Sequence, residues 1–122
     1  TTFARTMQDT QEMIDSGDWD RTSPRHLVAL YCLMHIKVYG IEAVDIDSKA
    51  RYRMTMMAAN LVNNHFEGNF VDAVDFFRWM WSKEMRTEKW RREEKQTFGR
   101  LTAYKMFSTQ WLTEYRLTAK RS

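Results

Sequence analysis

Residues 23–40, SPRHLVALYCLMHIKVYG, decide the fold class because they form one long helical pattern with both ends marked. Ser23 suits the N-cap, Pro24 suits the first helical turn, and Gly40 suits the residue after the last turn. The apolar residues between these ends are Leu27, Leu30, Tyr31, Met34, Ile36, Val38 and Tyr39. They cover more than one face of the helix, which predicts a position at the centre of the core.

Further helices are predicted on both sides of this segment. Before it, residues 2–15 have the spacing of a short amphipathic helix, which the acidic turn SGDWD ends. After it, residues 41–47 (IEAVDID) alternate like a strand, but no comparable run can pair with them, so we expect an extended linker. Asp47 or Ser48 can cap a helix that runs to about Phe66, and Asn69 can cap another that begins at Phe70. The charged residues 85–97 favour a helical extension on the surface, and a last helix is expected from about Arg100 to Leu117.

The composition agrees with an all-α fold. Among 122 residues there are only four glycines and one proline, so chain breakers are few. A chain of this length can bury one hydrophobic core. We predict a single compact domain of about five helices over residues 1–122. Its parts are a peripheral N-terminal helix and acidic loop (1–22), a core (23–117, mainly 27–39, 52–66 and 70–81) and a basic tail (118–122).

The single cysteine, Cys32, excludes an internal disulfide and a cysteine-based zinc cluster. Cys32 lies among apolar residues, so we interpret it as a small core residue rather than a nucleophile. No apolar run has the length of a membrane span, and no signal-peptide pattern is present. We therefore expect a cytoplasmic, intracellular protein that does not insert into a membrane.

The charge of the chain is strongly polarised along its length. Residues 78–122 carry twelve Lys or Arg and five Glu, whereas residues 1–77 carry seven basic and eleven acidic side chains. Four of the five tryptophans also fall in the basic part. A basic, aromatic-rich half favours a polyanionic partner such as nucleic acid, of undetermined type and strandedness.

The residues expected to bind such a partner lie mainly in and just after the segment from Phe76 to Arg92, FFRWMWSKEMRTEKWRR. Clustered cations suit phosphates, and exposed aromatic rings suit the stacking of unpaired bases. The residues that we predict to contact nucleic acid are Arg86, Lys89, Trp90, Arg91, Arg92, Lys95 and Arg100. In the alternative interpretation, this is a solvated helix face whose cations are neutralised by the neighbouring glutamates.

The tryptophans of this segment receive different interpretations. Trp79 and Trp81 lie at helical spacing among apolar residues, so we expect both in the core. Trp90 is flanked by charges, and we favour a contact role for it, with inward packing as the alternative. A second basic set would extend the surface if the last helix packs beside the fourth; its members are Arg100, Lys105, Arg116, Lys120 and Arg121.

The sequence does not predict an enzyme. It contains no phosphate-binding loop, nucleophile elbow or paired-cysteine motif. The three histidines, His26, His35 and His65, are too far apart for a local metal motif, so we predict no metal site and no cofactor. The acidic residues Asp45, Asp47, Asp72 and Asp75 leave divalent-cation chemistry as an alternative, although Asp72 and Asp75 are equally explained by the dipole of a helix N-terminus.

Several sequence motifs, taken together, are similar to those of a known group of proteins. They are LxxLYxxxxxxVYG from Leu27, then FFRWMW, KWRRE and FGRLxxxxMFSxQWLxEYR. This pattern resembles small helical proteins encoded by bacteriophages beside replication or recombination genes. The resemblance implies a setting in nucleic-acid metabolism, and it assigns no functional residue.

Two functions follow as hypotheses. The first is a non-enzymatic nucleic-acid-binding accessory protein of the replication or recombination type. The second is a protein-interaction module that docks on a larger nucleic-acid machine or forms homo-oligomers. In that case its acidic front half and its basic back half would be complementary surfaces. The acidic residues concerned are Asp15, Asp18, Asp20, Glu42, Asp45 and Asp47.

Overall fold

The fold consists of helices joined by short loops. A computed structural model of the chain describes residues 2–121, and the side chains of residues 2–118. Within that range there are six helices and no strand, which confirms the all-α prediction. The helices are α1 (Phe3–Ser16), α2 (Pro24–Tyr39), α3 (Ser48–His65), α4 (Phe70–Glu93), α5 (Ala103–Met106) and α6 (Leu112–Arg121).

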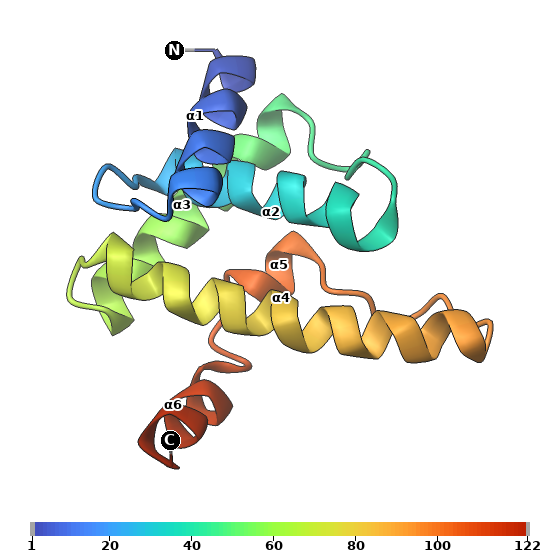
Figure 1. The fold of residues 1–122 in the computed structure, drawn as a ribbon. Coiled ribbons are helices and arrows are strands. Elements are labelled where there is room, and N and C mark those ends of the chain that lie inside the picture. The colour runs from blue at the N-terminus through green and yellow to red at the C-terminus, as the bar shows by residue number, and fades with distance from the viewer. Residues whose placement is uncertain (1, 122) are drawn as a thin grey trace.

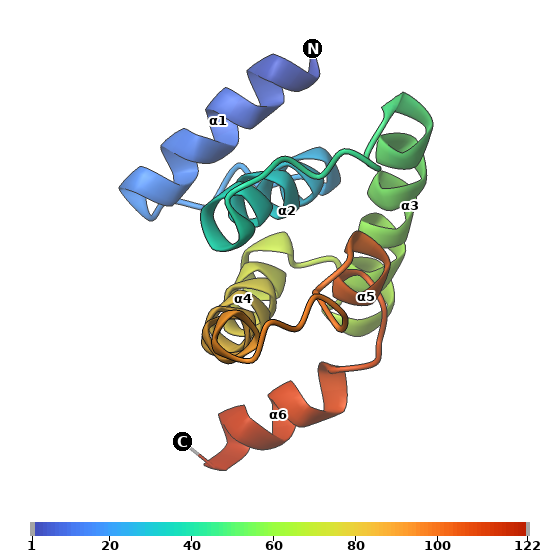
Figure 2. The ribbon, with the colours of Figure 1, turned by 90° about the vertical axis from the view of Figure 1, so that its right-hand side faces the viewer.

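Helix α2 lies at the centre of the molecule, as its sequence predicts. Its first turn is capped by Ser23, whose backbone N–H donates to Nδ1 of His26 over 3.0 Å. Its end is set by Gly40, which has a left-handed φ of 79° and donates its N–H to the carbonyl of Ile36. Figures 1 and 2 show α2 between α1 on one side and α4 on the other, with α3 crossing its end.

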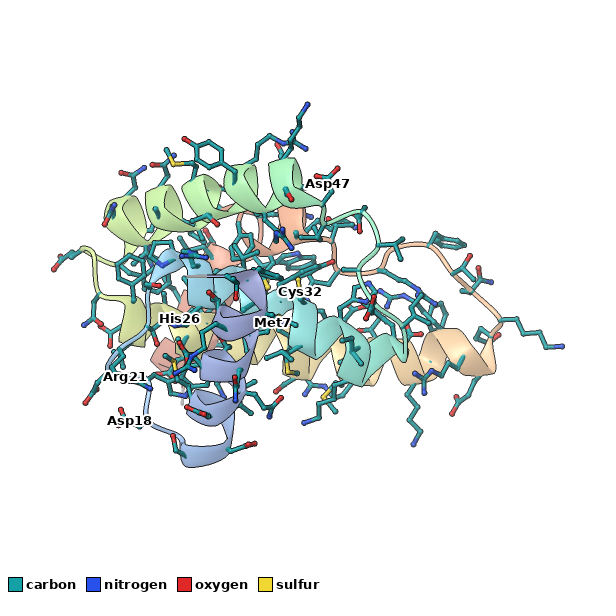
Figure 3. The ribbon with its side chains drawn as sticks, turned by 90° about the horizontal axis from the view of Figure 1, so that it is seen from above. Met7, Asp18, Arg21, His26, Cys32 and Asp47 are labelled. Atoms are coloured by element: carbon teal, nitrogen blue, oxygen red, sulfur yellow. The ribbon has the colours of Figure 1, made fainter. Side chains whose placement is uncertain are left out.

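The core collects side chains from all six helices. Buried contributions come from the three predicted segments and also from α1 and the region after α4; the largest fully buried side chains are Trp81, Phe76, Phe77, Met13, Leu27, Leu30 and Met106. Cys32 is buried as expected, inside the molecule in Figure 3, and burial raises the pKa of its thiol to about 11. Among the described residues, no helix has the length and apolar character needed to cross a membrane.

The linker between α2 and α3 differs from the expectation in detail. Residues 41–47 contain a turn, closed by a hydrogen bond from the N–H of Ile46 to the carbonyl of Ala43, rather than an extended segment. Asp47 is the cap of α3, because its carboxylate accepts the N–H of Ala50 over 2.8 Å. Figure 3 shows Asp47 at the start of that helix.

Helix α4 is the longest element, with 24 residues. Asn69 caps it as predicted by accepting the N–H of Asp72. The helix runs without interruption from its apolar first half into the charged segment and ends at Glu93. In Figure 1 its C-terminal half extends along the molecule below the end of α2, and the chain then folds back beside it.

The prediction of one last helix from Arg100 to Leu117 is wrong. The chain forms the short helix α5, a turn over residues 107–111, and then α6. Ser108 and Thr109 explain the break, because short hydroxyl side chains bond to nearby backbone groups and compete with the helix. Ser108 Oγ donates to the carbonyl of Lys105 over 2.8 Å. Helix α6 continues to Arg121, so the expected basic tail is helical up to that residue.

Candidate nucleic-acid interface

The C-terminal half of α4 carries charged side chains on two opposite faces, and the helical period separates them. The inner face, defined here as Glu84, Glu88 and Arg91, follows steps of four and three residues, which keeps its members on one side of a helix. All three side chains are buried, and Arg91 and Glu88 are each only 4% exposed. This face points toward α2 and the loop after α4.

An ion-pair network fills the inner face. Arg91 Nη1 donates to Glu84 Oε1 and, over 3.1 Å, to Glu88 Oε2. Its Nη2 donates to the carbonyl of Gly99, in the loop after α4. Tyr39, the last residue of α2, donates its hydroxyl to Glu84 over 2.7 Å and accepts the N–H of Leu101 over 2.8 Å. The network therefore joins α4, α2 and the loop.

The environment fixes the protonation of two members of this network. Burial opposes the charge on Arg91, but the hydrogen bonds that it donates to Glu84 and Glu88 outweigh this effect and raise the pKa of the guanidinium above its ordinary value. Burial, together with the acceptor Glu84, also raises the pKa of Tyr39 well above its ordinary value. Arg91 therefore stays charged and Tyr39 stays neutral near neutral pH. A charged group this deeply buried needs such partners, since an unpaired one is very costly.

Arg91 consequently differs from the other predicted contact residues. Its guanidinium is enclosed by Glu84, Glu88 and Gly99 and does not reach a ligand on the surface. We assign it to holding the helix end in place rather than to phosphate contact. The sequence indicates this pairing through the spacing of Glu84, Glu88 and Arg91, because charges four and three residues apart are neighbours on a helix. The burial itself depends on Tyr39 and the loop, which lie far away in sequence.

The outer face, defined here as Arg86, Lys89 and Trp90, is exposed to solvent. The indole of Trp90 is 53% exposed, in agreement with the contact role favoured from sequence. Lys95 follows shortly after the helix end and is also exposed. Within the described part of the chain, no carboxylate lies within 4.0 Å of the charged nitrogens of Arg86, Lys89 or Lys95. The outer face thus presents uncommitted cations beside an accessible aromatic ring.

Arg92 and Arg100 lie at the boundary between the two faces. Arg92 Nη2 donates to the carbonyl of Val38 over 2.7 Å, and its Nε lies 3.7 Å from Glu88, yet 63% of its side chain is exposed. Arg100 lies 3.8 Å from Glu88 and places its guanidinium 4.8 Å from the centre of the Tyr39 ring. Both arginines contact the C-terminal end of α2, Arg92 at Val38 and Arg100 at Tyr39. Arg92 also keeps surface for a ligand, whereas Arg100 is mostly covered.

The other aromatic residues follow the prediction only in part. Trp81 is fully buried, as predicted, whereas Trp79 is only partly buried and packs against the edge of the core on Phe76 and Tyr115. Tyr52, in the predicted core segment 52–66, is 70% exposed. Phe98 is 73% exposed in the loop that folds back along α4. The sequence does not predict this exposure, because a phenylalanine in a loop has no periodic pattern.

The described members of the second basic set do not extend the outer face. Helix α6 packs beside the N-terminal half of α4, where Tyr115 meets Phe76 and Trp79. Arg116 accordingly donates to the carbonyl of His65, at the end of α3. Lys105, in α5, donates over 3.5 Å to the carbonyl of Arg100 in the loop before that helix. The side chains of Lys120 and Arg121 lie outside the described residues.

The candidate metal ligands do not converge. Among the described residues, no three His, Cys, Asp or Glu side chains are grouped so that they could hold a metal ion. Asp47 caps α3, and His26 closes the first turn of α2. Asp72 is in the first turn of α4, where an acidic residue complements the helix dipole. These groups therefore have structural explanations in their own helices.

Comparison with known proteins assigns no family to this chain. No protein-family model matches it, and neither a curated protein nor a solved structure does. The resemblance to small bacteriophage proteins therefore stays a hypothesis.

Proposed function

We propose that this protein is a non-enzymatic nucleic-acid-binding accessory protein that binds a single strand along the outer face of α4. The observation that carries the proposal is the exposed side chain of Trp90 on a helix that also presents Arg86 and Lys89 to solvent, where neither cation has a carboxylate within 4.0 Å among the described residues. Phosphates are attracted to uncommitted cations, and unpaired bases stack on exposed aromatic rings.

Each part of the interface has a distinct role in this proposal. Arg86, Lys89 and Lys95 contact phosphates, and Arg92 contributes the exposed part of its side chain. Trp90 offers a stacking surface to one base. Arg91 does not contact the ligand in this proposal, and it stabilises the C-terminal half of α4 from its buried side. Sequence specificity is expected to be low, because stacking and phosphate contact do not read base edges.

A salt series with labelled oligothymidylate and a labelled duplex tests the proposal. Contact through four cations, Arg86, Lys89, Arg92 and Lys95, predicts a slope of about −3 for the logarithm of single-strand affinity against the logarithm of salt. The single strand should bind more tightly than the duplex. Absence of measurable binding at low salt contradicts the proposal.

A matched pair of variants locates the binding surface. Arg86→Glu with Lys89→Glu reverses two charges on the outer face, and Lys49→Glu with Arg53→Glu reverses two exposed charges on α3. The net charge of both variants is the same. The first should abolish binding, and the second should reduce it only slightly through long-range attraction. Equal losses would show that binding depends on overall charge and not on this face.

Exposed apolar residues favour self-association as a second candidate function. In the linker between α2 and α3, Ile41 is 59% and Val44 is 90% exposed, beside the carboxylates of Glu42 and Asp45. Figure 1 shows this linker and the C-terminal end of α4 on the same side of the molecule. A two-fold dimer can therefore place the acidic linker of each copy against the basic outer face of the other. Light scattering over a range of protein concentrations at low salt tests this arrangement, which a strict monomer excludes.

A further inference from the structure

A cavity lies between the loop that follows α1, helix α2 and the middle of α4. Its volume is about 210 Å³, which is room for on the order of ten water molecules. Its walls are mainly apolar and include Ile14, Leu30, Met34 and Met85. Figure 3 shows Asp18 at the periphery of the same loop, between two residues that line the cavity, Gly17 and Trp19.

Two tryptophans of the lining each have a buried hydrogen-bond donor without a partner. Trp19 and Trp81 both line the cavity, and they are 9% and 1% exposed. Within the described part of the chain, neither indole Nε1–H finds an acceptor. A buried tryptophan usually pairs this group, and leaving it unpaired costs free energy. Less than 1 Å² of each of these nitrogen atoms is accessible, so the two tryptophans line the cavity with other atoms of their side chains.

The charges at the cavity have one sign. Lys37 and Arg78 belong to its lining and are exposed, and no acidic residue among the described ones contributes to it. Ser82 is the other polar side chain that the lining contains within the described part of the chain. Apart from that hydroxyl, every polar side chain of the lining can donate a hydrogen bond and cannot accept one. The lining therefore complements a negatively charged ligand, and its indoles and thioethers complement an aromatic ring.

We infer that this cavity binds a small aromatic carboxylate, with the ring among the apolar walls and the carboxylate between Lys37 and Arg78. The size of the cavity limits the ligand to about ten non-hydrogen atoms, since each takes up roughly the room of one water molecule. The lining of this cavity does not include Arg86, Lys89 or Trp90, so the inference does not rest on the proposed nucleic-acid surface.

Proton–nitrogen NMR of the five indole groups, with benzoate as the probe, tests the inference. Trp19→Phe, Trp81→Phe and Trp90→Phe identify three of the signals. The carboxylate should shift the Trp19 and Trp81 signals saturably and leave the Trp90 signal in place. Oligothymidylate should do the reverse, so failure of one site does not affect the result for the other. No shift with millimolar carboxylate overturns the inference.

Charge-matched probes and variants separate specific binding from adsorption to an apolar hollow. The neutral analogue benzyl alcohol should bind at least threefold more weakly than benzoate, and the cation benzylamine more weakly still. Lys37→Gln with Arg78→Gln should lower carboxylate affinity at least threefold, while Lys49→Gln with Arg53→Gln should leave it unchanged. Equal affinity for the three probes, or equal losses in the two variants, overturns the inference.

Discussion

The inner and outer faces of the C-terminal half of α4 contain similar residue types and have opposite fates. On the inner face, Arg91 is 4% exposed and is enclosed by two glutamates, a tyrosine-bound network and a backbone carbonyl. On the outer face, Arg86 and Lys89 are exposed and have no acidic partner within reach among the described residues. Two positions along the helix separate an arginine that supports the fold from a lysine that is available to a ligand.

This difference shows that the number of charges in a segment is a poor guide to their role. An α-helix makes one turn every 3.6 residues, so the side chains of a continuous basic segment point in different directions around its axis. Those facing the core must be paired, because an isolated buried charge is very unfavourable. Those facing water cost little and remain free to bind. Stability and binding should therefore respond separately to substitutions on the two faces.

Loss of the buried arginine should have the largest effect. Arg91→Ala leaves Glu84 and Glu88 buried without their cation, which should reduce the free energy of unfolding by about 3–5 kcal/mol. Lys89→Ala, on the outer face of the same turn, should change it by no more than about 0.5 kcal/mol. Urea denaturation of both variants measures the contrast. Similar small losses in the two variants would mean that the inner network does not stabilise the helix end.

Tyr39→Phe should have the next largest effect on stability. It removes the hydroxyl that bonds Glu84 and Leu101, and it keeps the ring that packs against Trp81. Two buried polar groups then lose a partner, so we expect a loss of about 1–3 kcal/mol in unfolding free energy. Oligothymidylate affinity, measured under conditions where the variant is folded, should be unchanged. A weakened affinity in the folded variant would place Tyr39 in the interface.

Arg92→Ala tests the boundary between the faces. The substitution removes the hydrogen bond to Val38 at the end of α2 and also an exposed cation. Stability should fall by about 1 kcal/mol, as for a single hydrogen bond from a charged group that is partly exposed. The salt slope of oligonucleotide binding should decrease by roughly 0.7, the value for one phosphate contact to a single strand. An unchanged slope would make Arg92 a purely structural residue.

The parts of the fold that sequence predicted are those determined locally. Ser23, Pro24, Gly40 and Asn69 mark helix ends through their own backbone preferences, and all four positions act as expected. The break at Ser108 was missed, because the apolar spacing of Leu101, Phe107 and Leu112 continues across it and the competing hydrogen bonds are local and weak.

The candidate site was predictable in its exposed members and not in its buried one. Charge density around Trp90 indicated a surface position for the indole, and the structure places it there. The inward position of Arg91 depends on Tyr39 and on the loop carbonyl of Gly99, which meet it only in the folded protein. The cavity between Trp19 and Trp81 likewise joins residues that are far apart in the chain.

Trp90→Ala is the most direct test of the account, with unfolding free energy and oligothymidylate affinity measured on the same variant. An exposed indole that stacks on a base predicts a change in stability within about 1 kcal/mol and a loss of roughly 1–3 kcal/mol in binding free energy. A loss of about 3–5 kcal/mol in stability, as for a buried aromatic residue, with unchanged affinity would contradict it.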